Sequence, residues 1–172
     1  MPPSADRKSL LLDSCVAEYS LNHHIQPSLT AKLKEWASDK FDLAISEISY
    51  AELIHGAFKN KVDRVEKLLN TYTRFEVTQQ GLRGAGVVGN VYRTKDTSIS
   101  NLGLADRIIA ATCFIHDLPL VTANVRDFPY PFFKTVVDED IIYHKGNKRV
   151  LLSISVLLPK NDRLQYWYRR TK

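Results

Sequence analysis

Residues 104–128, LADRIIAATCFIHDLPLVTANVRDF, are the stretch that decides the fold. The first half has almost no polar face, which predicts a helix buried on most sides, with Asp106 in its first turn, where the helix dipole favours an anion. The apolar run from Leu118 to Thr122 is typical of a buried strand in a parallel sheet. Polar residues follow from Ala123 to Asp127. Because ligands of open α/β sheets bind beyond the carboxyl ends of the strands, this stretch predicts a site there.

The rest of the chain repeats the alternation of strand and helix. A first buried strand is predicted over Ser9–Val16, where three leucines run into Asp13, and later strands over Phe41–Ser46 and Phe75–Val77. Helical spacing of apolar residues is found between them, for example over Ile48–His55. This alternation predicts an α/β fold, a three-layer α/β/α sandwich with a mainly parallel central sheet, plus a C-terminal extension.

Size and charge divide the chain into three parts. With 172 residues and 44% hydrophobic content, it can bury one proper core. We expect a flexible N-terminus over residues 1–9, one domain over 10–137, and a basic extension over 138–172 in which Val150–Leu158 forms an extra strand. The extension has eight basic and four acidic residues, whereas the first 137 residues have sixteen and fifteen. The basic character therefore belongs to the extension.

Composition also bears on the compartment. Cys15 and Cys113 are the only cysteines, and both lie in apolar stretches, which favours free buried thiols in a reducing environment over a disulfide. The N-terminus is polar and lacks the features of a signal peptide. No run approaches the roughly 20 apolar residues that a membrane helix needs, so we expect no membrane partner and a cytoplasmic protein.

A glycine-rich segment, GLRGAGVVG at residues 81–89, superficially resembles a phosphate-binding loop. No Gly-Lys-Ser/Thr follows it, and no strong strand with a dinucleotide fingerprint precedes it. Apolar residues recur at helical spacing from Leu82 to Tyr92. The sequence therefore favours a glycine-rich helix packed closely on its neighbours over a nucleotide site.

Several acidic residues can meet at one edge of the predicted sheet. Asp13 ends the first strand, Glu52 lies on the helix after the second, Asp106 opens a helix, and Asn124 with Asp127 follows the strand Leu118–Val121. A lone Asp after a strand is often only a turn or cap residue, so each must be judged with the others. Carboxylates without counter-charges raise one another's pKa and are expected to hold a divalent cation or to be partly protonated. Oxygen ligands select Mg²⁺ or Mn²⁺, and the five histidines show no zinc-type spacing.

Two further residues of the same stretch are candidates. Thr122 is either a structural residue at the end of its strand or a group that orients a ligand or a water. Arg126 is a candidate contact to phosphate. For phosphodiester hydrolysis, bound ions lower the pKa of a water, orient it for attack and offset charge on the leaving oxygen.

Three blocks, LLLDSCV, SYAELIHGA and LADRIIAATCFIHDLPLVTANVRDF, resemble those of PIN-domain ribonucleases, most closely the VapC-type toxins of toxin–antitoxin pairs. The resemblance covers about Leu10 to Val137. It implies a Rossmann-like α/β/α sandwich and a Mg²⁺- or Mn²⁺-dependent endoribonuclease, often a homodimer, inhibited by a small antitoxin that inserts near the acidic site. It carries the three family acids onto Asp13, Glu52 and Asp106, and the family threonine onto Thr122.

The sequence departs from the family pattern in the fourth acid. Many relatives have Asp where this chain has Asn124, so either Asn124 acts as a neutral ligand or Asp127 supplies the charge. Ser14 and Cys15 also stand where many relatives have Thr-Asn. These departures leave a second hypothesis open, a catalytically weak or inactive PIN-like module that binds RNA or a partner. A phosphatase is disfavoured because no Asp-x-Asp motif follows the first strand.

The extension ends in aromatic and basic residues. Trp167, Arg169 and Arg170 combine cations with aromatic faces, as single-stranded nucleic acid binders do. The alternative is that the aromatic residues pack the extra strand onto the domain or across a dimer. Both interpretations fit the sequence.

Overall fold

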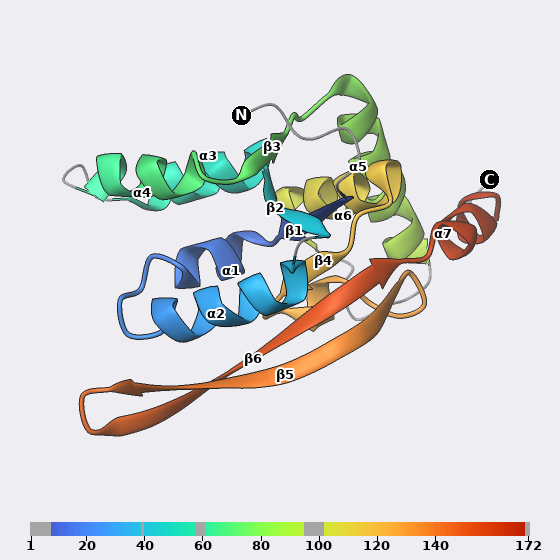
Figure 1. The fold of residues 1–172 in the computed structure, drawn as a ribbon. Coiled ribbons are helices and arrows are strands. Elements are labelled where there is room, and N and C mark those ends of the chain that lie inside the picture. Colours follow the sequence, from blue (N-terminus) through green and yellow to red (C-terminus); the bar gives the residue numbers. More distant parts are fainter. Residues whose placement is uncertain (1–7, 39, 58–60, 95–101, 171–172) are drawn as a thin grey trace.

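The structure is a computed structural model that describes residues 8–38, 40–57, 61–94 and 102–170. Strands and helices alternate through most of the chain, and a long hairpin and a short helix follow (Figure 1). In chain order the elements are β1 (Lys8–Leu12), α1 (Ser14–Tyr19), α2 (Gln26–Ala37), β2 (Phe41–Ser46), α3 (Glu47–Gly56), α4 (Val62–Leu69), β3 (Thr73–Phe75), α5 (Gln79–Thr94), α6 (Leu104–His116), β4 (Leu120–Thr122), η2 (Val125–Asp127), β5 (Phe133–Lys145), β6 (Lys148–Pro159) and α7 (Asn161–Tyr168).

The described strands form one six-stranded sheet in the order β3-β2-β1-β4-β6-β5. The first four strands are parallel, so their carboxyl ends lie at one edge of the sheet. β6 pairs antiparallel with β4, and β5 pairs antiparallel with β6. The sheet is therefore mainly parallel, as predicted, with an antiparallel hairpin on one side.

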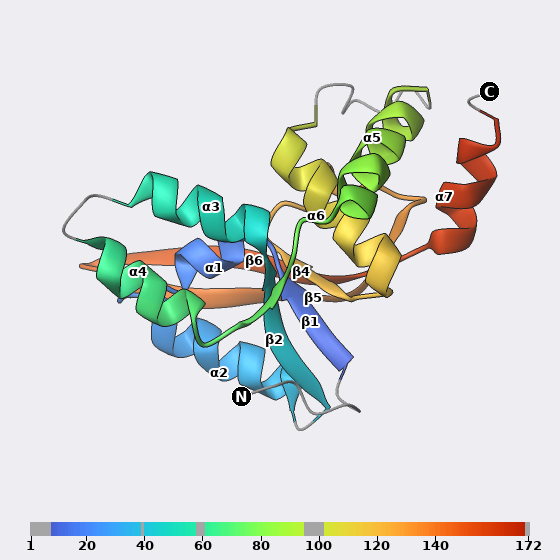
Figure 2. The same ribbon diagram turned by 90° about the horizontal axis from the view of Figure 1, so that it is seen from above.

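The two faces of the sheet carry two separate parts of the core. Leu10 and Leu12 of β1 belong to a cluster that includes apolar residues of α1, α2, α3 and α4. Leu11 belongs to a second cluster, with residues of α5, α6 and α7. Successive residues of a strand point to opposite faces, so a run of three leucines serves both clusters. Figure 2 shows the two groups of helices on opposite sides of the sheet, which confirms the predicted three layers.

Local predictions agree with the structure to within a few residues. The second strand has the predicted bounds, Phe41–Ser46, and the glycine-rich segment lies within α5. The first strand is shorter than predicted, because Asp13 is the N-cap of α1 and the chain turns there into a helix. The third strand also lies two residues earlier than predicted, at Thr73–Phe75.

The C-terminal extension is continuous with the domain. The expected boundary between residues 137 and 138 lies inside β5, and the predicted extra strand corresponds to β6, which pairs directly with β4. Most of the N-terminus expected to be flexible, residues 1–7, lies outside the described residues, and Lys8 and Ser9 belong to β1. Among the described helices, none has the length and apolar character needed to cross a membrane.

Two glycines of α5 form a matched pair for a stability test. A Cβ on Gly84 would lie 3.1 Å from the Cβ of Ala111 in α6, whereas a Cβ on Gly86 would meet nothing within 4 Å. We expect Gly86→Ala to stabilise the protein by about 0.5–1 kcal/mol, because alanine is the better helix former. Gly84→Ala should stabilise the protein by less than this amount or should destabilise it, because its new methyl group forces α5 and α6 apart. Urea unfolding measures both, and equal stabilisation would contradict the tight packing of these helices.

Candidate active site

Asp13 is held in place by groups from a neighbouring strand. It follows β1, is only 4% exposed, and accepts a hydrogen bond of 2.6 Å from the Thr122 hydroxyl at the end of β4. Thr122 is fully buried, and its hydroxyl accepts a bond of 2.9 Å from the backbone N–H of Asn124. The threonine thus orients the Asp13 carboxylate and fixes the start of the segment that leads to Asp127.

Cys15 adds a second contact to the same carboxylate. Its Sγ donates to Asp13 Oδ2 at 3.1 Å. Burial, and then the charge of Asp13, raise the pKa of this thiol to about 12. Cys15 is therefore an inert donor at neutral pH and no nucleophile. Both cysteines are free thiols, as predicted.

Glu52 reaches the site from α3, the helix that follows β2. Its Oε2 accepts a hydrogen bond of 2.5 Å from the Ser14 hydroxyl in α1, so the first and second acids are linked through consecutive residues of one segment. In the sequence, Ser14 stands out only as a departure from the family pattern. Its position beside Asp13 is the signal that points to a role in placing a neighbouring acid.

Asn124 and Asp127 form a pair across the η2 turn. The Asn124 side-chain amide donates a short hydrogen bond to Asp127 Oδ2. Burial and then the charge of Asp13 raise the pKa of Asp127, while Arg126 and the Asn124 amide act in the opposite direction. Arg126 is exposed on the same turn. The candidate contact to phosphate therefore lies beside the acids.

Asp106 is the carboxylate most affected by its neighbours. It lies in the first turn of α6, and burial raises its pKa to about 6. Burial is the largest cause of this value, and the charges of Asp127, Asp13 and Glu52 contribute to it in that order. The acid that follows β1 and those of α3, α6 and η2 thus share one electrostatic environment at the carboxyl edge of the sheet, as predicted.

The carboxylate oxygens of these four acids are suitable ligands for a divalent cation. In the described part of the chain, no Lys or Arg forms an ion pair with these four acids, and three of them instead accept hydrogen bonds from neutral groups. The same described residues contain no trio of His, Cys, Asp or Glu close enough to hold an ion as it stands. Mutual repulsion of unneutralised carboxylates accounts for both observations, because it keeps the acids apart and three of them turn to a neutral donor.

Three candidate RNA-binding residues of the extension lie away from the acids. β6 runs antiparallel to β4, so α7 begins near the amino edge of the parallel strands, at the far end from the acids (Figure 1). Trp167 is half-buried against the second core cluster, and Arg169 and Arg170 are exposed at the end of α7, with Arg170 over the Tyr166 ring. The structure does not bring these residues to the acidic site.

A cavity of about 520 Å³ opens beside the acids, between α1, α3 and α4. Its lining includes the polar residues Ser14 and Glu52, the apolar residues Leu53 and Val65, and the basic residues Lys61 and Arg64. The cavity combines an apolar surface with access to a carboxylate, so it fits a segment that carries both apolar and basic side chains.

Known proteins share the fold of this chain. The PIN domain family model matches residues 10–130. Ribonuclease VapC10 of Mycobacterium tuberculosis is 40% identical over 87 residues, which are 51% of this chain and 63% of the relative, so the match spans less than two thirds of that relative's length. Ribonuclease VapC19 of the same organism is 29% identical over 119 residues, 69% of this chain and 91% of the relative. A toxin–antitoxin complex from Klebsiella pneumoniae has a chain that is 26% identical, with a TM-score of 0.57, over 72% of this chain and 92% of that one.

Proposed function

The chain belongs to the PIN domain family, and from this premise we propose that it is a metal-dependent endoribonuclease that hydrolyses phosphodiester bonds of RNA. The observation that carries the proposal is the group of four acids at the carboxyl edge, which has no paired cation among the described residues. Burial, and then the charges of the other three acids, raise the pKa of Asp106 in this group to about 6. Such a site gains free energy when a divalent cation neutralises it. The names of the VapC relatives support RNA as the substrate.

In this proposal Asp13, Glu52, Asp106 and Asp127 hold Mg²⁺ or Mn²⁺. Ser14, Thr122 and the Asn124 amide are positioning residues, because each donates to one of these carboxylates. The ion, when bound, supplies an activated water and offsets charge on the leaving oxygen. Arg126, exposed beside Asp127, is in reach of a phosphate of the substrate.

We further propose that the protein is the toxin of a type II toxin–antitoxin pair. The likeness to a chain of a toxin–antitoxin complex supports this role. The cavity between α1, α3 and α4 is the place for the antitoxin segment, since a basic side chain bound there would reach Glu52 and Ser14. Assembly as a homodimer stays a prediction.

The direct test is cleavage of RNA by the purified protein. We expect cleavage with Mn²⁺ or Mg²⁺, none with excess EDTA, and recovery when the ion is restored. DNA of the same sequence is the control substrate. Cleavage that persists in EDTA would contradict the assigned chemistry, because the acids alone supply no nucleophile at neutral pH.

A second candidate function is an inactive PIN-like module that binds RNA or a partner. It is favoured by the absence, among the described residues, of three acids close enough to hold an ion without movement. Thermal melting distinguishes the two, since a competent site is stabilised by Mn²⁺ through mass action and a degraded one is not.

A further inference from the structure

We propose that the end of the β5–β6 hairpin binds the phosphate backbone of RNA next to the candidate active site. We call residues 139–154 the arm, because they lie beyond the strand pairs of β4, and residues 144–149 the arm tip. The inference rests on the proposed function only in taking the bound RNA as the substrate.

The direction of the arm places it on the side of the acids. Thr122, the last residue of β4, pairs with Ser155, and β6 continues from there past the carboxyl edge to Arg149. Six residues of strand span about 20 Å, so the tip stands that far beyond the Thr122–Asp13 pair. Figures 1 and 2 both show the hairpin extending past the ends of α1 and α2, in the direction in which the α3–α4 pair also projects.

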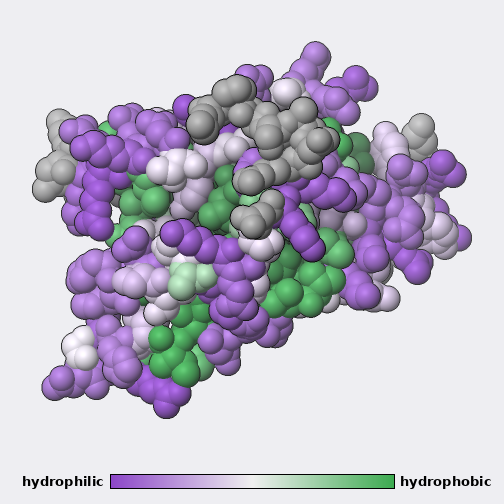
Figure 3. Space-filling model, in the orientation of Figure 1, coloured by the Kyte–Doolittle hydropathy of each residue, from purple (hydrophilic) through white to green (hydrophobic). Residues whose placement is uncertain are grey.

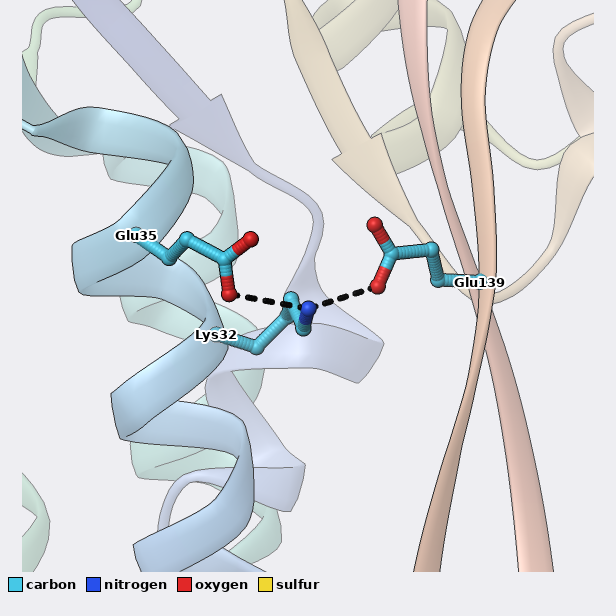
Figure 4. Close-up of polar contacts among 3 residues, drawn as sticks. All are labelled: Lys32, Glu35 and Glu139. Atoms are coloured by element: carbon cyan, nitrogen blue, oxygen red, sulfur yellow. Dashed lines mark ion pairs between the residues drawn. The ribbon is translucent and has the colours of Figure 1, made fainter.

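The arm is fixed at its base. Lys32 of α2 contacts Glu139 of β5 at 2.7 Å and Glu35 at 2.9 Å, and it joins the helix to the hairpin (Figure 4). Tyr143 packs against the core cluster on the same side. These contacts hold the two strands of the hairpin against the domain. The tip therefore has a fixed position relative to the acids.

The tip carries positive charge that forms no ion pair with any of the residues that the structure describes. No acidic residue occurs between Ile141 and Pro159, whereas Lys145, Lys148 and Arg149 are basic and exposed. The acids nearer the base are already engaged, since Asp138 and Asp140 accept hydrogen bonds from Ser155 and Ser153, and Glu139 pairs with Lys32.

The pairing of the two strands places basic residues opposite each other at the arm tip. Lys145 lies directly opposite Lys148, and His144 lies opposite Arg149, across a turn in which Gly146 has a φ of +60°. Like charges directly opposite each other destabilise a strand pair. An anion bound at the tip relieves this repulsion, and the phosphates of a nucleic acid supply such anions in a row.

A protein partner is the competing class. Ile142 and Leu151, which pair across the hairpin, are 43% and 56% exposed, and Figure 3 shows hydrophilic residues at the end of the arm with a hydrophobic area further along it. Two aliphatic side chains supply far less area than the roughly 800 Å² per partner of a stable interface. The charge of the tip and its position beyond the carboxyl edge, on the side of the acids, favour RNA.

The test compares two variants that lose the same charge. The arm variant carries Lys145→Gln, Lys148→Gln and Arg149→Gln, and the control carries Lys8→Gln, Lys34→Gln and Lys40→Gln, all exposed. Lys8 is the first residue of β1, Lys40 precedes β2 and Lys34 lies in the last turn of α2, so the control changes the amino edge. Affinity for a fluorescently labelled single-stranded RNA is measured by anisotropy in EDTA, over a range of salt.

We expect the arm variant to bind this RNA about tenfold more weakly at physiological salt, with a slope of log affinity against log salt smaller by about 2, as for three lost phosphate contacts. The control should change less than twofold. With metal, KM for the long RNA should rise in the arm variant, while kcat for a dinucleotide, too short to reach the tip, should stay unchanged. Melting curves check that both variants fold.

Equal binding by the arm variant and the control would overturn the inference, as would an intact protein that binds no RNA. A variant that loses only self-association, measured by size-exclusion chromatography, would assign the arm to a protein interface and overturn it too. If the intact protein binds RNA through the arm but cuts none with either metal, the inference stands and the proposed nuclease function fails.

Discussion

Asp106→Asn should slow RNA cleavage by about a hundredfold or more. Removal of a group that only supports a metal ligand already lowers metal affinity or activity by about 10–100-fold. In the proposed site Asp106 is a ligand itself, and its pKa of about 6 reflects burial and then the charges of Asp127, Asp13 and Glu52. Asparagine keeps the shape and removes the charge that holds the ion. The measurement is kcat/KM on RNA with Mn²⁺ in excess.

The same substitution should make the metal-free protein more stable at neutral pH. Folded Asp106 holds its proton up to about pH 6, whereas an aspartate in an unfolded chain loses it near about pH 3.9. The folded state therefore binds more protons between these values, and its stability falls as the pH rises through this window. Asparagine has no such loss, so the variant should lose less stability between pH 4 and pH 7 in EDTA, measured by urea unfolding.

Asp117→Asn is the matched control for both effects. Asp117 is exposed at the other end of α6, with a φ of +51° that asparagine also adopts readily. We expect cleavage to stay unchanged. An Asp106→Asn variant that cuts as well as this control would show that the acidic site is assigned wrongly.

Asp127→Asn should reduce kcat/KM and weaken Mn²⁺ binding by about tenfold to a hundredfold, on the scale of lost metal-site groups. Among the neighbouring charges, Asp127 has the largest effect on the pKa of Asp106, which indicates that its carboxylate faces the shared site. Asn124 acts on that carboxylate through its amide. Asn124→Ala should therefore reduce kcat/KM and Mn²⁺ affinity only a few-fold, because it removes a positioning contact and no charge.

The two positions can also be exchanged. A double variant, Asn124→Asp with Asp127→Asn, returns the acid to the place that it has in many relatives. If Asp127 is the ligand, the exchange should leave Mn²⁺ affinity as low as in Asp127→Asn alone. Recovery of affinity and cleavage would assign the site to position 124 instead, as would a larger loss in Asn124→Ala than in Asp127→Asn. Calorimetric Mn²⁺ titration and kcat/KM give both comparisons.

Much of the fold could be predicted because local sequence patterns determine where its strands and helices form. The run Leu10-Leu11-Leu12 and the segment Phe41–Ser46 have the continuous apolar character of strands buried on both faces, and both are strands of the parallel sheet. Apolar spacing over the glycine-rich segment predicted α5 despite its resemblance to a loop. Parallel strands then place the residues after them at one edge, which is why Asp13, Glu52 and Asp106 could be grouped before any geometry was known.

The sequence was less informative where pairing joins distant residues. It predicted a strand at Val150–Leu158, but it gave no sign that residues 133–145 form an equally long partner or that the hairpin adds to the sheet beside β4. The alternating pattern of β5 mixes charged and apolar residues, and its burial depends on the neighbours it meets. The basic aromatic end of the chain was a candidate for RNA contact, but antiparallel pairing carries it away from the acids.

The sequence by itself therefore determined the class of fold, the family, and which acids belong to one edge, because periodicity and strand order act over short distances along the chain. Only the tertiary structure decided which neutral group each carboxylate contacts, why Asp127 and Asn124 act as a pair, and where the arm points. These depend on contacts between residues far apart in sequence, such as Asp13 with Thr122 and Glu139 with Lys32. Local patterns cannot specify such contacts, since the energy that selects them arises only when the layers pack together.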